Sequence, residues 1–206
     1  MKTGTLYVVS TPIGNPEDLT LRALRVLRDV GLIAAEDPQA TQTLLEPHQI
    51  ATPLTTYHNL NKEEKTPLLM ARLCEGQSIA LVSDAGTPVV QDPGRYLIAK
   101  AVAAGITVSP IPGPSALLAA LVGTGWSADQ FALVAPWPAR SAPQKRRLPA
   151  EQAGLGLLVL FVEPRRLQAT LSRLKKELGN RQAVLARNLT TPTEQYVRGS
   201  LGELME

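Results

Sequence analysis

Short apolar segments typical of buried β-strands recur along the chain, and helix-like segments separate many of them. The strand candidates lie at residues 5–9, 78–82, 107–111, 131–135, 157–162, 183–187 and 194–198. Continuous apolar strands that alternate with helices are typical of a largely parallel sheet, so the sequence predicts an α/β fold. In such folds ligands bind beyond the carboxyl ends of the strands. A site is therefore expected in the loops that follow strands.

Two helices stand out by their periodicity. Asp18 is expected to cap the first, in which one face is apolar and formed by Ala23, Leu24, Leu27 and Val30. Another face of this helix carries Arg22, Arg25 and Arg28, and we interpret it as a solvated surface. The second helix is predicted at 167–178, with Gly179 just beyond its end.

Composition excludes several classes of protein. Apolar residues make up 44% of 206, which is enough to bury a core, and the net charge of +3 is compatible with an anionic partner. The single cysteine, Cys74, excludes a disulfide framework and a multi-cysteine metal site, and we interpret it as a small core residue. No metal is expected. The apolar runs are too short for a signal peptide or a membrane span, so a cytoplasmic protein without membrane contact is expected.

Three loops after strand candidates are unusually rich in glycine, proline and small residues. They read "STPIGN" (10–15), "SDAGTP" (83–88) and "PIPGPSA" (110–116). Glycine allows a ligand to approach the backbone, and proline reduces the entropy lost on binding, so the loops predict a preformed site. Neither the dinucleotide-binding glycine motif nor the Walker lysine motif is present. The third loop is the expected domain boundary, with domains at 1–111 and 112–206.

Taken together, these loops and the segments "GTLYVVSTPIGNPEDLTLRAL", "LIAAED", "TPLTTYHNLN" and "QYVRGSLGEL" resemble a known family. It is the tetrapyrrole-methylase superfamily of S-adenosylmethionine-dependent methyltransferases. Within it, the chain is similar to the group that 2′-O-methylates a cytidine of bacterial small-subunit ribosomal RNA. The resemblance covers nearly the whole chain. It implies two α/β/α domains with the ligand cleft between them, S-adenosylmethionine as methyl donor, and a homodimer.

The resemblance also implies which residues hold the methyl donor. The loops would contribute Pro12, Asp84, Ala85, Gly86, Thr87, Val90, Ser115 and Ala116. The second domain would contribute Val162, Leu185 and Ala186. On this interpretation the loops offer backbone, rather than catalytic side chains, to the sulfonium group.

The chain departs from the family's pattern in segments expected to face the substrate. "EDPQAT" (36–41) has Pro38 and Gln39 where the family has Thr and Arg, and "FVEPRRL" (161–167) is shortened. "VAPWPAR" (134–140) and "ARNLT" (186–190) also differ, and family members usually continue beyond Glu206. The donor loops match. The resemblance therefore implies donor binding through the matching loops, while the differences lie in the segments expected to face the RNA.

Methyl transfer to a ribose hydroxyl needs a group that removes the hydroxyl proton. Glu36, Asp37 and Glu163 are the candidates, each at or just after a strand-like apolar run, and Asp37 is favoured. The alternative interpretation of Glu36 and Asp37 is a helix cap. His58, in "YHNLN", is interpreted as a structural hydrogen-bonding residue.

Ribosomal RNA as a partner requires basic groups near the site. The densest basic cluster is Arg140, Lys145, Arg146 and Arg147, which is expected to contact phosphates. A solvated loop is the alternative. Two other functions stay open: methylation of a small tetrapyrrole by the same fold, and a non-catalytic relative that binds only the donor or RNA.

Overall fold

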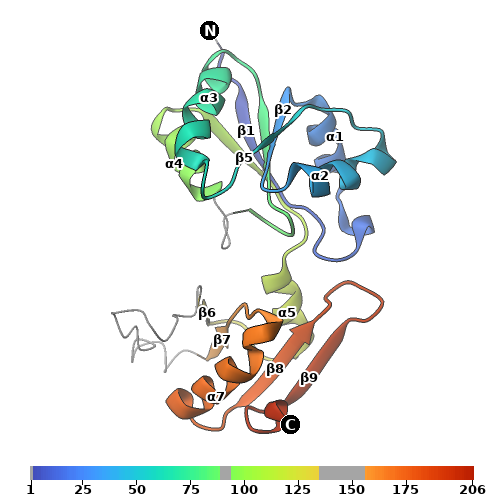
Figure 1. Ribbon diagram of the computed structural model, residues 1–206, viewed down its shortest axis with the longest axis vertical. Helices are drawn as coiled ribbons and strands as arrows, with labels where there is room; N and C mark the ends of the chain where they lie inside the picture. The colour runs from blue at the N-terminus through green and yellow to red at the C-terminus, as the bar shows by residue number, and fades with distance from the viewer. Residues whose placement is uncertain (1, 89–93, 135–155) are drawn as a thin grey trace. The chain divides into compact units, whose positions relative to one another are not determined.

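The computed structural model describes residues 2–88, 94–134 and 156–206 (Figure 1). The chain forms two compact units, Met1–Ala116 and Leu117–Glu206. The boundary expected from the sequence lies earlier, between residues 111 and 112. Each unit has its own sheet structure and its own packed side chains, and each is described separately below.

The first unit is built on a five-stranded parallel sheet in the order β3-β2-β4-β1-β5. The strands are β1 (Thr5–Val9), β2 (Leu32–Ala35), β3 (Leu54–Thr56), β4 (Ile79–Val82) and β5 (Thr107–Ile111). The expected strands at 5–9 and 107–111 are confirmed, and β4 begins one residue later than expected. The strand candidates omitted β2 and β3, because one is short and half alanine and the other is three residues long with two threonines.

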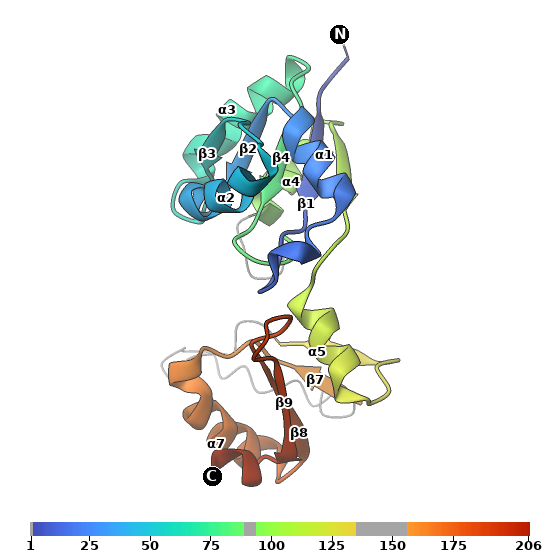
Figure 2. The ribbon, with the colours of Figure 1, turned by 90° about the vertical axis from the view of Figure 1, so that its right-hand side faces the viewer.

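Helices cover both faces of this sheet (Figures 1 and 2). They are α1 (Leu21–Asp29), α2 (Pro38–Leu45), α3 (Lys62–Cys74) and α4 (Gly94–Ala103). Successive side chains of a strand point to opposite faces. In β2, Ile33 packs with apolar residues of α1 and α2, whereas Leu32 packs with those of α3 and α4. This alternation, in which every residue of β2 and β4 is buried, confirms the expected α/β/α layering.

The strand order creates a topological switch point between β1 and β4. These strands are neighbours, with Leu6 opposite Ile79 and Val9 opposite Val82. The chain leaves β1 toward β2 on one side of the sheet and leaves β4 toward β5 on the other. The loops after β1 and β4 therefore diverge at the same edge, which is where open parallel sheets bind their ligands.

Two details of the expected helices are wrong. Asp18 does not cap α1; it lies in a 3-10 turn, Pro16–Asp18, and Thr20 is the N-cap, with its hydroxyl oxygen accepting a hydrogen bond from the Ala23 amide at 3.1 Å. Cys74 is exposed rather than buried, because it ends α3 and successive helix residues are rotated by about 100°, which turns it away from the buried Leu73. The apolar face of α1 is as expected, with Ala23 and Leu27 fully buried.

We expect Thr20→Ala to lower the free energy of unfolding by about 1 kcal/mol, because the Ala23 amide loses its capping partner. Urea unfolding followed by circular dichroism measures this loss. Thr20→Ser keeps the hydroxyl and should retain most of the stability. Equal losses in both variants would show that the methyl group of Thr20, rather than the cap, stabilises this turn.

The second unit contains α5 (Ala116–Thr124), which begins at the boundary, and α7 (Leu167–Leu178). Its strands are β6 (Phe131–Leu133), β7 (Leu157–Val159), β8 (Gln182–Arg187) and β9 (Gln195–Ser200). β6 pairs parallel with β7, and β8 pairs antiparallel with β9. The expected helix at 167–178 is confirmed, and Gly179 follows it with a φ of 79°. Among the described residues, no helix is long and apolar enough to cross a membrane.

Candidate functional site

The loops after β1 and β4 are joined by reciprocal backbone hydrogen bonds. The Thr11 amide donates to the Gly86 carbonyl at 2.9 Å, and the Gly86 amide donates to the Thr11 carbonyl at 3.0 Å. The buried hydroxyl of Thr11 also donates to the Ser83 carbonyl at 3.0 Å. The loops 10–15 and 83–88 therefore form one unit at the switch point.

A chain of two hydroxyl groups connects these loops to the third. The Thr87 hydroxyl donates to the Pro114 carbonyl at 3.1 Å and lies 2.9 Å from the Ser10 hydroxyl. A hydroxyl has a single proton, so the Ser10 hydroxyl is the donor to Thr87. The Ser10 amide also donates to the Ile111 carbonyl at 3.2 Å. The loops after β1, β4 and β5 are thus one hydrogen-bonded cluster, which we call the loop cluster (residues 10–15, 83–88 and 110–116).

Two glycines allow these loops to approach one another closely. Gly86 has a φ of +81°, and a Cβ atom there would lie 3.2 Å from a methyl carbon of Ile13 and 3.7 Å from the Pro114 carbonyl oxygen. A Cβ atom on Gly113 would lie 3.0 Å from the Cβ of Ser10. A Cβ atom at either position would require its neighbour to shift by a few tenths of an ångström. Gly86 and Gly113 were expected to let a ligand approach the backbone closely. They also let the three loops pack closely against one another.

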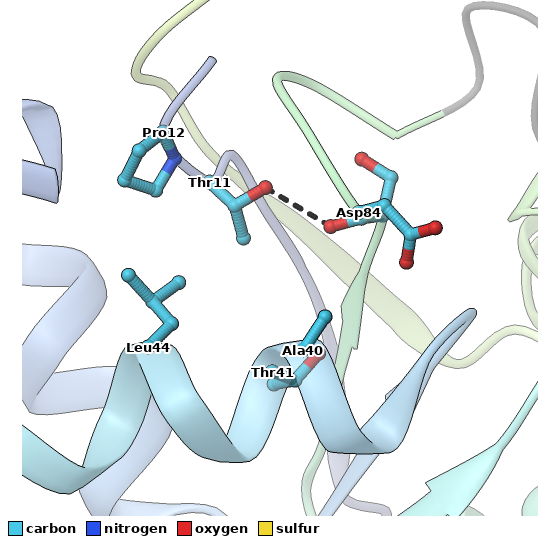
Figure 3. Close-up of a pocket in the computed structure, with 7 residues that line it drawn as sticks. Thr11, Pro12, Ala40, Thr41, Leu44 and Asp84 are labelled. Carbon is cyan, nitrogen blue, oxygen red and sulfur yellow. Dashed lines mark hydrogen bonds between the residues drawn. The ribbon is translucent and has the colours of Figure 1, made fainter. Parts of the chain in front are cut away.

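A pocket of about 110 Å³ opens beside the loop cluster (Figure 3). Its walls come from the ends of β1 and β4 and from α2, and the lining residues are Thr11, Pro12, Ala40, Thr41, Leu44, Ser83 and Asp84. Figure 3 shows Pro12 and Leu44 on one side and the Asp84 carboxylate on the other. The pocket is thus apolar at one end and acidic at the other.

Asp37 and Asp84 are linked at this edge of the sheet. The Asp37 amide donates to Oδ1 of Asp84 at 3.0 Å. The Asp37 carboxylate caps α2, since its Oδ1 accepts from the Gln39 amide at 2.8 Å and the Ala40 amide at 3.2 Å. The helix-cap interpretation of Asp37 is therefore confirmed, while its catalytic role stays a prediction. Glu36, directly before it, is half-buried.

The "YHNLN" segment follows β3 at the same edge. The hydroxyls of Tyr57 and Thr66 lie 2.9 Å apart and share a hydrogen bond, and burial raises the pKa of Tyr57. The backbone amide of His58 donates to the Asn61 side chain at 2.8 Å. The buried Nδ1 of His58 has no hydrogen-bond partner among the described residues. His58 was predicted to make structural hydrogen bonds. It does so through its backbone amide, whereas the Nδ1 atom of its ring has no partner among the described residues.

The other residues expected at the donor site are placed as follows. Ala85 is exposed in its loop, Ser115 is half-buried, and Ala116 begins α5. Val162, Leu185 and Ala186 belong to the second unit, where the last two lie in β8 opposite Val197 and Tyr196. Their contribution stays a prediction. Val90 lies outside the described residues.

The remaining candidate base and the predicted RNA-contacting residues lie outside the loop cluster. Glu163 is exposed in the second unit, where it forms an ion pair with Arg165 at 2.7 Å. The expected RNA-contacting residues Arg140, Lys145, Arg146 and Arg147 lie outside the described residues. Within the described ranges, no group of three or more His, Cys, Asp or Glu side chains could hold a metal ion.

The sequence interpretation missed the hydroxyl residues that join the loops. Ser10, Thr11 and Ser83 are each buried directly after an apolar strand. A signal was present: both β1 and β4 end in Val followed by Ser, at the position where an apolar strand becomes a polar loop. It also missed the α2 wall of the pocket, because that contact depends on the strand order rather than on a local pattern.

We expect Thr11→Val to destabilise the first unit by about 1–2 kcal/mol, because the nearly isosteric side chain leaves the buried Ser83 carbonyl without this donor. The matched control is Thr43→Val in α2, whose hydroxyl also donates to a carbonyl, that of Gln39, at 3.0 Å, but in an exposed position. The control should lose no more than about 0.5 kcal/mol. Equal losses in urea unfolding would contradict a special role for Thr11.

Comparison with known proteins agrees with this architecture. The family model for Tetrapyrrole (Corrin/Porphyrin) Methylases matches residues 5–205. A ribosomal RNA small subunit methyltransferase I from Micromonospora olivasterospora is 46% identical over 98% of this chain, and one from Halalkalibacterium halodurans is 42% identical over 97%. The chain spans 64% of the length of the first of these relatives and 69% of the second.

Solved structures share the fold. The native form of uroporphyrin III C-methyl transferase from Thermus thermophilus has a TM-score of 0.68 at 22% identity, covering 98% of this chain and 92% of that one. The Thermus thermophilus enzyme has also been solved with S-adenyl homocysteine, with a TM-score of 0.66 over 98% of this chain and 86% of that one. The α/β fold of the tetrapyrrole methylases and the family resemblance inferred from the sequence are confirmed. The chain belongs to the tetrapyrrole methylase family.

Proposed function

We propose that this chain transfers a methyl group to the 2′-hydroxyl of a cytidine in small-subunit ribosomal RNA. S-adenosylmethionine is the methyl donor of the family, as expected from the sequence. The observation that carries the proposal is the loop cluster, in which three glycine- and proline-rich loops are held together at the switch point. The names of the relatives support RNA, rather than a tetrapyrrole, as the substrate.

The loop cluster fits a methyl donor in three respects. Its hydrogen bonds fix the backbone before binding, so little conformational entropy is lost. Gly86 adopts a φ of +81°, which glycine tolerates and which L side chains rarely adopt. The pocket next to it, at about 110 Å³, is smaller than the ~300–1,000 Å³ typical of sites for drug-sized ligands, so it holds one part of the donor.

The charges beside the pocket suit the reaction. The donor supplies a methyl group on a positively charged sulfur. The Asp84 carboxylate lines the pocket and accepts a hydrogen bond from the Asp37 amide, and the Asp37 carboxylate caps α2 at the same edge. Negative charge at this edge favours a sulfonium. In the transfer, the ribose oxygen forms a bond to the methyl carbon as the carbon–sulfur bond breaks, and a base accepts the hydroxyl proton. Asp37 is the proposed base, with Glu36 and Glu163 as alternatives.

Three further expectations belong to this proposal. The donor is expected to contact Pro12, Asp84, Ala85, Gly86, Thr87, Val90, Ser115 and Ala116, and also Val162, Leu185 and Ala186 from the second unit. The basic residues Arg140, Lys145, Arg146 and Arg147 are expected to contact RNA phosphates. A homodimer is expected from the family, and sedimentation giving one species near the monomer mass at micromolar concentration would contradict it.

A transfer assay tests the proposal. The purified chain is incubated with S-adenosylmethionine carrying a labelled methyl group and with small ribosomal subunits from cells that lack this modification. The expected result is label in the RNA, recovered as 2′-O-methylcytidine after nuclease digestion. Label in an added uroporphyrinogen but not in RNA would favour the tetrapyrrole alternative. No transfer to either substrate, with donor binding intact, would favour a non-catalytic relative.

A further inference from the structure

The exposed face of α1 carries three arginines in a stripe. Arg22, Arg25 and Arg28 are spaced by three residues and are all exposed, whereas Ala23, Val26 and Leu27 are buried against the sheet. At 3.6 residues per turn, each arginine is rotated by about 60° from the one before, and the three extend about 9 Å along the helix. Leu21, on the same face at the start of α1, is 87% exposed. We call these three residues the arginine stripe.

The arginine stripe has one acidic neighbour on α1, Asp29, which lies four residues after Arg25 and is exposed. Among the described residues, none of the three arginines forms an ion pair; Arg28 donates instead to the His48 backbone carbonyl at 3.3 Å. By contrast, α7 pairs Arg173 with Glu177, four residues later, at 2.7 Å. Like charges three residues apart on a helix repel each other. The face of α1 thus concentrates positive charge at a cost in helix stability.

The stripe begins beside the loop cluster. α1 follows the loop after β1 through the 3-10 turn Pro16–Asp18, and its N-cap Thr20 lies near the loop after β5. The Thr20 methyl is 3.6 Å from the place that a Cβ atom on Gly113 would take. Arg22 is therefore in the first turn of a helix that starts at the candidate donor site. A polyanion lying on α1 would have one end next to the pocket.

We infer that the arginine stripe binds the phosphates of the RNA substrate next to the donor loops; this inference rests on the proposed function. Arginine presents a planar fork of donors that matches a phosphate group, and it keeps its charge at all physiological pH values. RNA phosphates would also relieve the repulsion between the three guanidinium groups. The stripe is thus a substrate-binding surface rather than the solvated helix face expected from the sequence.

The test measures RNA binding over a series of salt concentrations. Binding of a fluorescein-labelled single-stranded oligoribonucleotide is followed by anisotropy, for the parent and for Arg22→Ala/Arg25→Ala. Each lost phosphate contact reduces the steepness of the plot of log affinity against log salt by about 0.7. The slope for the double variant should therefore be about 1.4 less steep than the slope for the parent. A four-fold rise in salt should then weaken the parent about seven-fold more than the variant. Donor affinity should be unchanged, and the unfolding midpoint should not fall, because the repulsion between the arginines is removed.

Two controls separate a phosphate-binding surface from other effects. Arg72→Ala/Lys100→Ala removes the same charge from α3 and α4, on the opposite face of the sheet, and should leave the salt slope close to that of the parent. Arg22→Lys/Arg25→Lys keeps the charge and should retain the slope. An unchanged slope in Arg22→Ala/Arg25→Ala overturns the inference, and so does an equal loss in the Arg72/Lys100 variant.

The outcome for the proposed function is distinguishable from these. If the parent methylates small subunits and the double variant binds RNA as the parent does, the arginine stripe is only a solvated face and the proposed function stands. If the parent neither binds the oligoribonucleotide at low salt nor methylates subunits, both fail.

Discussion

Gly86→Val should weaken binding of S-adenosylhomocysteine at least ten-fold, which corresponds to about 1.4 kcal/mol. The residue has a φ of +81°, which costs an L-residue about 1–2 kcal/mol, and a β-branched one more. Its side chain would also meet Ile13 and the Pro114 carbonyl, so it would push apart the loops that form the candidate site. Isothermal titration calorimetry measures the affinity, and urea unfolding measures the accompanying loss of stability.

Gly105→Val is the matched control for this prediction. Gly105 follows α4 with a φ of +69°, in the same left-handed region, but a Cβ atom there would have no neighbour within 4 Å. Both variants should therefore lose stability from backbone strain, and only Gly86→Val should lose donor affinity. If the two variants bind the donor equally well, the space around Gly86 has no role in binding, and the donor site lies elsewhere.

Asp37→Asn should lower the rate of methyl transfer by about 10²–10⁴, the usual contribution of a general base. Asparagine is as good an N-cap as aspartate, so its side-chain oxygen can still accept from the Gln39 and Ala40 amides. The variant thus removes the basic carboxylate and preserves the start of α2. The transfer assay with small subunits gives the rate, and thermal unfolding reports on the fold.

Two outcomes distinguish the roles of Asp37. Asp37→Ala loses the cap as well as the carboxylate, and it should be both inactive and less stable by about 1 kcal/mol. If Asp37→Asn transfers methyl groups at the parent rate, Asp37 is a structural cap alone. Glu36→Gln and Glu163→Gln are then the next variants, because these two carboxylates are the other candidates for the base.

The sequence predicted those strands of the first unit that are marked by apolar residues. β1 has the expected bounds because apolar residues mark it clearly; β5, with the sequence TVSPI, also has the expected bounds although only Val108 and Ile111 are aliphatic. β3, with the sequence LTT, is an edge strand whose pairing with β2 stabilises it, and no local pattern marks it. The cap of α1 was misplaced for a similar reason: Asp18 and Thr20 are both good caps, and only the 3-10 turn at Pro16–Asp18 decides between them.

The site was predictable as a set of loops but not as a hydrogen-bonded cluster. Glycine and proline content marked all three loops, and the family resemblance predicted which of their residues hold the donor. The links between Ser10, Thr87 and Pro114 join residues 77 and 27 positions apart, which only the strand order brings together. The same holds for the wall that α2 contributes to the pocket.

The central claim is that the loop cluster holds the methyl donor, and hydrogen–deuterium exchange with and without S-adenosylhomocysteine tests it most directly. Backbone amides of residues 10–15, 83–88 and 110–116 should exchange more slowly with the ligand present, because binding stabilises these loops against opening. The helix α3 (Lys62–Cys74) should exchange at the same rate in both samples. Protection of other segments with these loops unchanged, or no protection at millimolar ligand, would contradict the claim.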